Sequence, residues 1–466
     1  MKPTLVLVPL TAGAAIFALH ACQHETPPAP APAAAQPAQV PFPPPKTKTE
    51  PGDPLDIFNN ENAPRVRFKP QEQELGFVEY SEGLPKSGTW RGYPLLHDFN
   101  RDGRADLVAS NREEDGFSCW LAPVKGPWIL CNDGPQKDVG GIPRDMQYGP
   151  SRAADIDSDG DDDLLVSAHK DALRLFRNVP ALDANGAPAP DGKLHWLEST
   201  PAPENPYLLI DLAVGNIDGD GFPDVAAIGH FKGGIAVYLG DGKGGMRRLP
   251  ESQQIISPNT FGQHIDLVDI DGDGIDDIVS STNRGLKVFV TRRTDGGFQW
   301  QDRSAGLPAP KIGNSISGQA VGHFLGGKSV QIATCLVPDP TIKPEALDSL
   351  GLYGWNEAKQ TWEHADRGLR RDEVYRELGA ADLNADGHLD LVTFSLESGA
   401  VVYLGDGAGS FKPKGRLPNI FGVGRIAFGD MDADGLVDLL VSIPATKERP
   451  EMGGLRAMLN KREIWK

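Results

Sequence analysis

The sequence predicts an all-β fold, a seven-bladed β-propeller with four-stranded blades, and three observations support this. A nine-residue acidic loop, Asp/Asn-x-Asp/Asn-x-Asp-Gly-x-x-Asp, occurs six times in the 466-residue chain. Apolar, strand-like runs precede and follow the copies. The copies lie about 50 to 60 residues apart, except for one interval of about twice that length, and such a period is typical of stacked structural units.

The acidic loops combine the residues that a calcium site requires. Positions 1, 3 and 5 carry oxygen ligands, glycine at position 6 permits a sharp turn, position 7 offers a carbonyl, and Asp at position 9 completes the set. Calcium accepts about six to eight such hard oxygen ligands. The ligand positions are Asp98, Asn100, Asp102, Arg104 and Asp106 in loop 1; Asp155, Asp157, Asp159, Asp161 and Asp163 in loop 2; Asn216, Asp218, Asp220, Phe222 and Asp224 in loop 3; Asp269, Asp271, Asp273, Ile275 and Asp277 in loop 4; Asp382, Asn384, Asp386, His388 and Asp390 in loop 5; Asp430, Asp432, Asp434, Leu436 and Asp438 in loop 6.

Two other interpretations of these loops are weaker. An EF-hand requires a bidentate Glu at position 12 and a helix on each side. Position 12 instead lies in an apolar, strand-like run, and its residues are Ala109, Val166, Ala227, Ser280, Thr393 and Val441. Surface turns that bind nothing would also contain Asp and Gly, but turn chemistry does not require the acid at position 9.

The segment around loop 3 defines the repeating unit. Strand-like runs cover residues 211–216, 223–228, 234–239 and 246–249, and four short strands per unit are typical of a propeller blade. The long interval between loops 4 and 5 repeats the strands without the acids, because His323 and Leu325 occupy the positions of the first and third ligands. We therefore expect a seventh blade that lacks a metal site.

Closure of the ring is predicted at the N-terminal end of the repeats. Residues 77–85 resemble the fourth strand of other blades but precede the first loop, so they are expected to complete the last blade. Such closure removes an exposed sheet edge. The pair Ile464 and Trp465 is the alternative source of that strand.

The repeats resemble FG-GAP/VCBS repeats, the units of the integrin α-subunit propeller and of many bacterial surface proteins. The acidic loops and the Gly-Asp-Gly-x-Gly turns at Gly240 and Gly405 carry the resemblance, from about Phe77 to the C-terminus. It implies up to six bound calcium ions. It does not fix a function, because this scaffold carries adhesins, lectins and some polysaccharide lyases.

The N-terminus predicts export. Residues 1–21 resemble a bacterial lipoprotein signal peptide, with Cys22 as the lipidated residue and plain secretion as the alternative. Residues 22–55 form a Pro/Ala-rich tether of polyproline type, and residues 56–466 form the propeller. We expect an extracytoplasmic protein anchored to a bacterial membrane by lipid alone, with the outer membrane favoured because Gln23 follows the cysteine; a secreted or periplasmic protein is the alternative.

The other cysteines lie within the propeller. Cys119 and Cys131 fall on the predicted third and fourth strands of the first blade, where they could form a disulfide across a hairpin. Cys335 follows an apolar run and is expected to be a buried thiol.

Charge suggests where a ligand would bind. The formal net charge is −18, but positions 1, 3, 5 and 9 of the loops supply 21 of the 64 acidic residues, so six calcium ions would bring the charge to −6. In the geometry of the resembled family, the opposite face carries the blade entrances, where Arg91, Arg152, Arg376 and Arg425 lie. We expect this cationic face to bind an anionic glycan or protein partner, and the acidic chain to avoid nucleic acid.

The expected function is therefore recognition or adhesion by a monomeric, calcium-stabilised propeller. A polysaccharide lyase acting on uronate-containing glycans is one alternative, with Tyr93, Tyr148, His230, His264 and Tyr375 as candidate acids and bases on the same face. None of these residues forms a catalytic spacing motif, so no catalytic residue is assigned. A structural role in an envelope complex is the other alternative.

Overall fold

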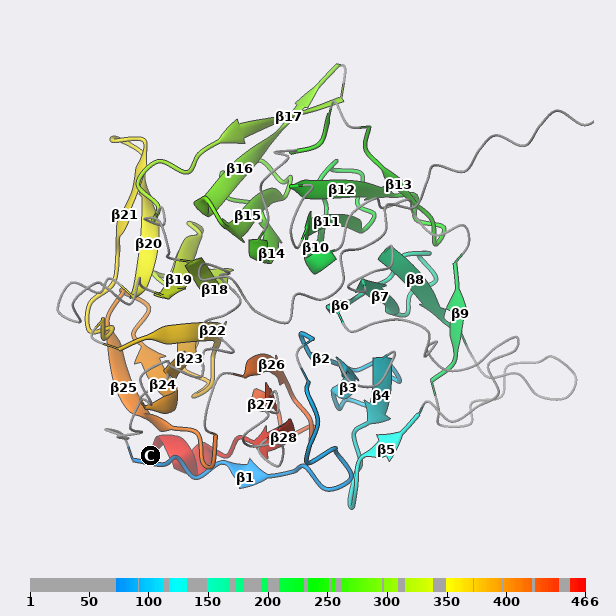
Figure 1. Ribbon diagram of the computed structural model, residues 1–466, viewed down its shortest axis with the longest axis vertical. Helices are drawn as coiled ribbons and strands as arrows, with labels where there is room; N and C mark the ends of the chain where they lie inside the picture. Colours follow the sequence, from blue (N-terminus) through cyan, green and yellow to red (C-terminus); the bar gives the residue numbers. More distant parts are fainter. Residues whose placement is uncertain are drawn as a thin grey trace, which may run out of the picture. The chain divides into compact units, whose positions relative to one another are not determined.

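The computed structural model describes residues 73–90, 92–111, 117–131, 149–167, 173–179, 194–199, 209–229, 234–250, 253–255, 262–295, 297–308, 315–337, 349–371, 373–395, 398–420, 424–443 and 453–466. These residues form seven four-stranded antiparallel sheets arranged in a ring (Figure 1). The predicted seven-bladed propeller is confirmed. The signal peptide, the tether and Cys22 lie outside the described residues, so the domain boundaries stay predictions.

Each blade takes its strands in chain order from the centre outward, and blade 7 takes its outer strand from the N-terminal end. Blade 1 consists of β2 (Leu95–His97), β3 (Asp106–Ser110), β4 (Phe117–Leu121) and β5 (Ile129–Leu130); blade 2 of β6 (Ser151–Ala154), β7 (Asp163–Ser167), β8 (Leu173–Asn178) and β9 (Trp196–Glu198); blade 3 of β10 (Leu209–Gly215), β11 (Asp224–Gly229), β12 (Ile235–Gly240) and β13 (Met246–Arg248); blade 4 of β14 (Gly262–Val268), β15 (Asp277–Thr282), β16 (Gly285–Thr294) and β17 (Gly297–Asp302); blade 5 of β18 (Ser315–Gly322), β19 (Gln331–Val337), β20 (Leu350–Asn356) and β21 (Thr361–His364); blade 6 of β22 (Tyr375–Ala381), β23 (Asp390–Ser395), β24 (Gly399–Gly405) and β25 (Phe411–Arg416); blade 7 of β26 (Arg425–Gly429), β27 (Asp438–Ile443), β28 (Gly454–Leu459) and β1 (Val78–Glu79).

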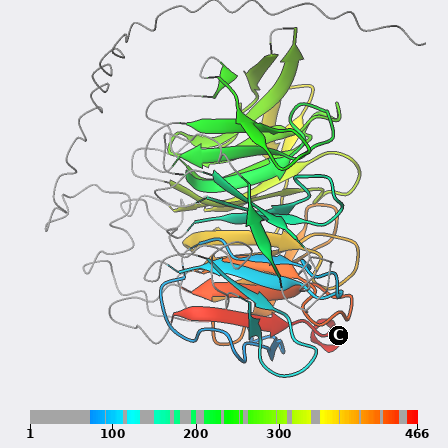
Figure 2. The same cartoon turned by 90° about the vertical axis from the view of Figure 1, so that its right-hand side faces the viewer.

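The first strand of each blade lines the centre of the ring (Figure 1). Strands β2, β6, β10, β14, β18, β22 and β26 contact one another in this order, and β26 contacts β2. In the view turned by 90°, the strands of the blades lie along roughly the same axis and alternate in direction (Figure 2). The loops that follow the first strands therefore lie at one end of these strands, and the chain enters the strands at the other end.

The second strands read as continuous apolar runs because neighbouring blades cover both of their faces. In β11, for example, every residue from Asp224 to Gly229 is buried. Outer strands are different: β13 alternates between exposed and half-buried residues, as expected for a strand with one face in water. Burial thus explains why the sequence shows apolar runs at β11 and little pattern at β13.

The hydrophobic core is divided among the blade interfaces. Seven clusters of buried side chains are present in the described part of the chain, and each joins two adjacent blades. The cluster between blades 1 and 7, for instance, packs Leu107 against Leu440 and Leu455. The apolar faces of each blade are therefore buried by its two neighbours, and an open ring would expose two apolar sheet faces.

The N-terminal strand closes the ring as predicted. Strand β1 pairs with β28, with Val78 opposite Leu459, and the Tyr80 N–H donates to the Ala457 carbonyl at 2.8 Å. Phe77 packs edge-on against Trp465, with ring centroids 5.9 Å apart. Ile464 and Trp465 do not supply the strand, because they lie in a short 3₁₀ helix, η5 (Arg462–Trp465).

The two cysteines of blade 1 are neighbours but do not form the predicted disulfide in the structure. Cys119 lies in β4, Cys131 directly follows β5, and the Cys131 N–H donates to the Cys119 carbonyl at 2.8 Å. A hydrogen bond with the Cys131 thiol, together with burial, raises the pKa of the Cys119 thiol. Cys335 is fully buried, as expected. Among the described residues, no helix has the length and hydropathy of a membrane span.

Ring closure can be tested at β1. Phe77 is 7% exposed within the cluster between blades 6 and 7, so Phe77→Ala should destabilise the protein by about 3 kcal/mol. The neighbouring Val78 is 47% exposed, and Val78→Ala should change the free energy of unfolding by less than about 0.5 kcal/mol. Denaturant unfolding of both variants checks this; equal effects would contradict closure by β1.

Candidate functional site

The six acidic loops share one backbone conformation. The residue at position 4 has a positive φ in every loop, between 57° and 79°, and the glycine at position 6 has a φ between 79° and 95°. At position 4 this left-handed conformation is adopted even by non-glycine residues, namely Arg101, Ser158, Ala385 and Ala433. Such a conformation costs about 1 kcal/mol or more per residue, so the loop must be held by other contacts.

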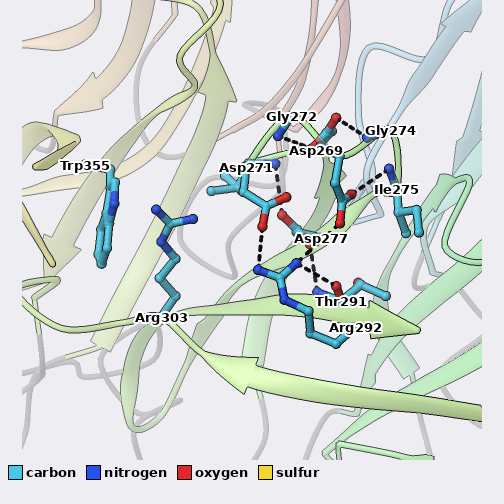
Figure 3. A network of polar contacts seen from close by, with 12 residues as sticks. Asp269, Asp271, Gly272, Gly274, Ile275, Asp277, Thr291, Arg292, Arg303 and Trp355 are labelled. Atoms are coloured by element: carbon cyan, nitrogen blue, oxygen red, sulfur yellow. Dashed lines mark hydrogen bonds and ion pairs between the residues drawn. The ribbon is translucent and has the colours of Figure 1, made fainter. Parts of the chain in front are cut away.

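Hydrogen bonds to the acids supply these contacts. In every loop the N–H of the position 6 glycine donates to the side chain at position 1, and the N–H of position 7 donates to the Asp at position 5. In loop 4 these bonds are Gly274 to Asp269, at 2.9 Å, and Ile275 to Asp273, at 3.0 Å (Figure 3). The acids therefore organise the loop backbone themselves, in the manner of Asx turns.

The Asp at position 9 has a structural role that the sequence analysis did not foresee. In loop 4 one oxygen of Asp277 accepts the Ile270 N–H at 3.0 Å, and the other accepts the Thr291 N–H at 2.7 Å (Figure 3). The same two bonds, one to position 2 and one to a residue in or directly after the third strand, occur in all six loops. Position 9 thus ties the loop to the third strand of its own blade.

These six carboxyl groups are fully buried. Burial is the main cause of their raised pKa values, and the two backbone hydrogen bonds oppose it only in part. The pKa is raised to about 7 for Asp106, Asp163, Asp277 and Asp438, and to about 6 for Asp224 and Asp390. A nearby cation would favour their ionised form.

Blade 5 separates the structural role of position 9 from metal binding. Gln331, which is 2% exposed, replaces the Asp. Its Oε1 accepts the Leu325 N–H at 2.9 Å, and its Nε2 donates to the Ser329 carbonyl at 2.9 Å. The loop is therefore held by a neutral amide, and the blade forms without acids at the other ligand positions.

The residues present fit a divalent cation. In each of the three loops with Asp at positions 1, 3, 5 and 9, three carboxylates bring oxygens within 4.8 Å of one another. The Oδ1 atoms of Asp155, Asp157 and Asp161 in loop 2 and of Asp432 in loop 6 are buried without a hydrogen-bond partner. Unsatisfied buried acceptors cost about 1–3 kcal/mol each, and more when charged. An ion held between them would remove this cost.

The acidic loops also contact the neighbouring blades. The position 2 carbonyl accepts a hydrogen bond from the next blade in three loops: Phe99 from the Asn178 side chain at 3.0 Å, Ile156 from the Gly244 N–H at 2.9 Å, and Leu383 from the Asn460 side chain at 2.6 Å. Ordering of a loop therefore also orders a blade interface.

A second polar group lies at the opposite end of the inner strands. We call it the axial cluster; it consists of Tyr93, Arg152, Asp211, His264, Glu377 and Arg425. Arg152 Nη2 lies 2.8 Å from Asp211 Oδ1, and Arg425 forms an ion pair with Glu377. The Arg425 guanidinium lies 4.2 Å from the centre of the Tyr93 ring, and Tyr93 Oη lies 3.2 Å from the ring nitrogens of His264. Six blades contribute to this cluster.

Bulges in the inner strands mark several of these positions. The register of the pairing between the first and second strands shifts immediately before Asp211 in β10, His264 in β14 and Glu377 in β22. A bulge re-aims the side chains that follow it, and bulges are frequent beside functional sites. Tyr93, Arg152, His264 and Arg425 were named from the sequence, but Asp211 and Glu377 were missed, and for these two an acidic residue within an otherwise apolar strand was the available signal.

Two of the four arginines predicted on the ligand face, Arg152 and Arg425, lie together, but they are not unpaired cations. Arg152 and Arg425 lie together in the axial cluster, and each is neutralised by a buried acid. Arg376 is 9% exposed, and burial lowers its pKa. Arg91 lies outside the described residues. In the described part of the chain, these arginines do not form a ring of unpaired cations.

The described candidate lyase residues do not all lie in one place. Tyr93 and His264 meet in the axial cluster, whereas Tyr375 is buried between blades 5 and 6 with its Oη 3.1 Å from that of Tyr403. Tyr148 and His230 lie outside the described residues. Burial raises the pKa of Glu377 to about 7, although Arg425 opposes this shift.

Comparisons with known proteins identify the repeats. The family model described as FG-GAP-like repeat matches residues 216–280 and 382–441, which contain loops 3 to 6. No similar sequence was found among proteins of curated function.

Three solved structures illustrate the likeness. A structure of BBS1N in complex with ARL6DN, soaked with lead, is 12% identical and covers 84% of this chain and 98% of its own, with a TM-score of 0.50. An Agrocybe aegerita lectin described as recognising non-reducing terminal N-acetylglucosamine is 15% identical, with coverages of 81% and 92% and a TM-score of 0.43. The V. cholerae biofilm matrix protein Bap1 is 13% identical, with coverages of 83% and 91% and a TM-score of 0.43. The likeness to the first concerns the fold alone.

The structural role of position 9 gives a prediction for loop 3. Asp224→Ala removes the acceptor for the buried Ile217 N–H and the partly buried Gly240 N–H, so it should destabilise the chelator-treated protein by about 2–4 kcal/mol. Asp220→Ala at the exposed position 5 is the control and should cost less than about 1 kcal/mol. Denaturant unfolding in chelator measures both; equal costs would show that position 9 has no structural role.

The axial cluster predicts a pH dependence. The pKa of Glu377 is about 7 in the folded protein against a usual 4.5, so the folded state holds the extra proton between these values. The free energy of unfolding should therefore fall as pH rises through this window, by up to about 3 kcal/mol from this group. Glu377→Gln removes the contribution, so the wild type should lose more stability than the variant between about pH 5 and pH 8. Parallel Tm curves would contradict this.

Proposed function

We propose that this chain, an FG-GAP repeat propeller, is a calcium-stabilised protein that recognises or adheres to a partner outside the cell. One observation carries the calcium part: the buried carboxylate oxygens of loop 2 that have no hydrogen-bond partner. Each ion would be held by the side chains at positions 1, 3, 5 and 9 and the carbonyl at position 7, and it would supply positive charge between crowded carboxylates.

The loops' own residues explain why an ion would matter for the whole ring. The side chains at positions 1 and 5 accept backbone hydrogen bonds within the loop, and position 9 connects the loop to the third strand. The carbonyl at position 2 reaches the next blade in three loops. Neutralising the carboxylates therefore stabilises the hairpin and the blade interface together, and it leaves the opposite end of the inner strands rigid.

The partner is proposed to be an anionic glycan or a carboxylate-rich protein segment that binds at the axial cluster. The side chains of Arg152 and Arg425 are 28% and 21% exposed, so both reach solvent although each has an acidic partner. A carboxylate ligand can share these guanidinium groups through their remaining N–H donors. The predicted lipid on Cys22 and the tether would hold the propeller at a distance from the membrane.

Calcium binding is tested first, on the full chain. Removal of calcium with a chelator should lower the Tm by more than about 5 °C, because each site at about a hundredfold excess over its Kd contributes about 2.7 kcal/mol. Calcium should restore the Tm better than magnesium, which tolerates irregular oxygen cages poorly. Elemental analysis after dialysis should find several calcium ions per chain; their absence would overturn the proposal.

The ligand is tested separately with a glycan array. Arg152→Gln combined with Arg425→Gln should lose binding to acidic glycans while keeping calcium content. Lys287→Gln combined with Lys359→Gln is the matched control, because these cations pair with Asp302 and Glu363 outside the cluster. Unchanged binding of the arginine variant to every acidic glycan that the wild type binds would contradict an axial site.

A polysaccharide lyase is the second candidate, and the contact between Tyr93 and His264 favours it. The imidazole can remove the proton α to a uronate carboxylate, the glycosidic C–O bond at the β carbon then breaks, and the phenol can give its proton to the departing oxygen while the arginine neutralises the acid. Incubation with acidic polysaccharides should then yield the ultraviolet absorbance of an unsaturated uronate, and Tyr93→Phe and His264→Ala should abolish it. A clean negative across substrates leaves recognition as the function.

A further inference from the structure

The six acidic loops fall into two charge classes. Loops 2, 4 and 6 have Asp at positions 1, 3, 5 and 9, whereas loops 1, 3 and 5 have Asn at position 1 or 3. Four carboxylates that share a small volume repel one another more strongly than three do. In the structure, the loops with four carboxylates each have a basic side chain beside them.

A basic side chain reaches each of the four-carboxylate loops from the same place in its blade. The residue whose N–H binds the position 9 Asp lies in the second half of the third strand or directly after it. Next to this residue stand Arg177 in blade 2, Arg292 in blade 4 and Lys461 in blade 7. These three residues are called the strand-end cations. Each contacts the Asp at position 3 of its loop.

The contacts are direct ion pairs. Arg177 Nη1 lies 3.3 Å from Asp157 Oδ2. In loop 4, Arg292 lies 2.5 Å from Asp271 Oδ2 and 3.3 Å from Asp273 Oδ2 (Figure 3). In loop 6, Lys461 Nζ lies 2.5 Å from Asp432 and 2.8 Å from Asp434.

The three-carboxylate loops lack this arrangement. The residues that flank the corresponding N–H are Leu121 and Pro123 in blade 1, Leu239 and Asp241 in blade 3, and Leu404 and Asp406 in blade 6. Within the described residues, other arginines touch two of these loops differently. Arg104 belongs to loop 1 and pairs with Asp102, and Arg293 donates to the Asp218 carbonyl of loop 3.

We propose that Arg177, Arg292 and Lys461 are built-in counter-ions that set the calcium affinity of the four-carboxylate loops. This rests on the proposed calcium binding. Each cation offsets the fourth carboxylate, so that every four-carboxylate loop presents the same net charge from positions 1, 3, 5 and 9 as a three-carboxylate loop. The built-in cation stabilises the ion-free loop. It weakens calcium binding because the two positive charges repel each other and because its ion pair occupies the Asp at position 3.

The exposure of the strand-end cations supports such a role. The side chains of Arg177, Arg292 and Lys461 are 33%, 39% and 31% exposed, so they can move aside without unpacking the core. In loop 6, Lys461 binds Asp432 Oδ2, while Oδ1 of the same carboxylate is buried without a partner. One oxygen thus serves the built-in cation and the other is left for the ion.

The experiment compares the full chain with Arg177→Met, Arg292→Met and Lys461→Met, singly and combined. Equilibrium dialysis in calcium buffers measures bound calcium, and thermal unfolding in chelator measures the ion-free protein. The combined variant should bind calcium about two- to fivefold more tightly at three sites, the factor expected for loss of a partly exposed ion pair. Its Tm in chelator should fall by a few degrees, because the ion-free loops lose their counter-ions.

The opposite signs of these two effects distinguish a counter-ion from a purely structural residue, whose loss would weaken both properties. Lys287→Met combined with Lys359→Met is the matched control and should leave calcium affinity unchanged. Unchanged or weaker calcium binding in the strand-end variants, while the wild type binds calcium, would overturn this inference alone. No calcium binding by the wild type would overturn the proposed function as well. If the combined variant does not fold, the single Lys461→Met variant decides by the same criteria.

Discussion

A buried carboxylate at the start of each second strand is the interaction on which the acidic blades depend. Asp277 shows how it works: one oxygen accepts the N–H of Ile270 at the beginning of the loop, and the other accepts the N–H of Thr291 in the third strand. Three strands of the blade are thereby joined at one point. Because the group is fully buried, its charge is costly unless donors or a cation surround it, so the fold and the metal chemistry share one residue.

Blade 5 shows how far this constraint reaches. Gln331 binds two backbone groups of its own loop, at Leu325 and Ser329, with a neutral side chain, and the blade packs between blades 4 and 6 like the others. Blade 5 therefore forms without a charge at position 9. Where the charge is present, the surrounding acids and the strand-end cations adjust the electrostatics of the loop.

The inner strands connect two polar regions with different roles. At one end, the acidic loops concentrate negative charge and contact neighbouring blades. At the other end, the axial cluster pairs Arg152 with Asp211 and Arg425 with Glu377 near the centre of the ring. Since the core is divided into seven interface clusters, a change at one loop acts first on the blades beside it. Contacts across the axis, such as Tyr93 with His264, link blades that are not neighbours.

The blades, the loop positions and the ring closure could be predicted from the sequence, including the blade in which His323 and Leu325 replace acids. Strand periodicity and turn chemistry are visible in short segments, and the ring closure follows from the repeat pattern, which leaves a fourth strand at the N-terminal end. The three-dimensional arrangement was needed to show that position 9 is a buried structural acceptor, that Lys461 contacts loop 6, and that Arg425 lies against Tyr93 and Glu377. It also left Cys119 and Cys131 as neighbouring thiols. Such contacts join residues as distant as Tyr93 and His264, 171 positions apart, and they depend on how the ring and its bulges bring the inner strands together.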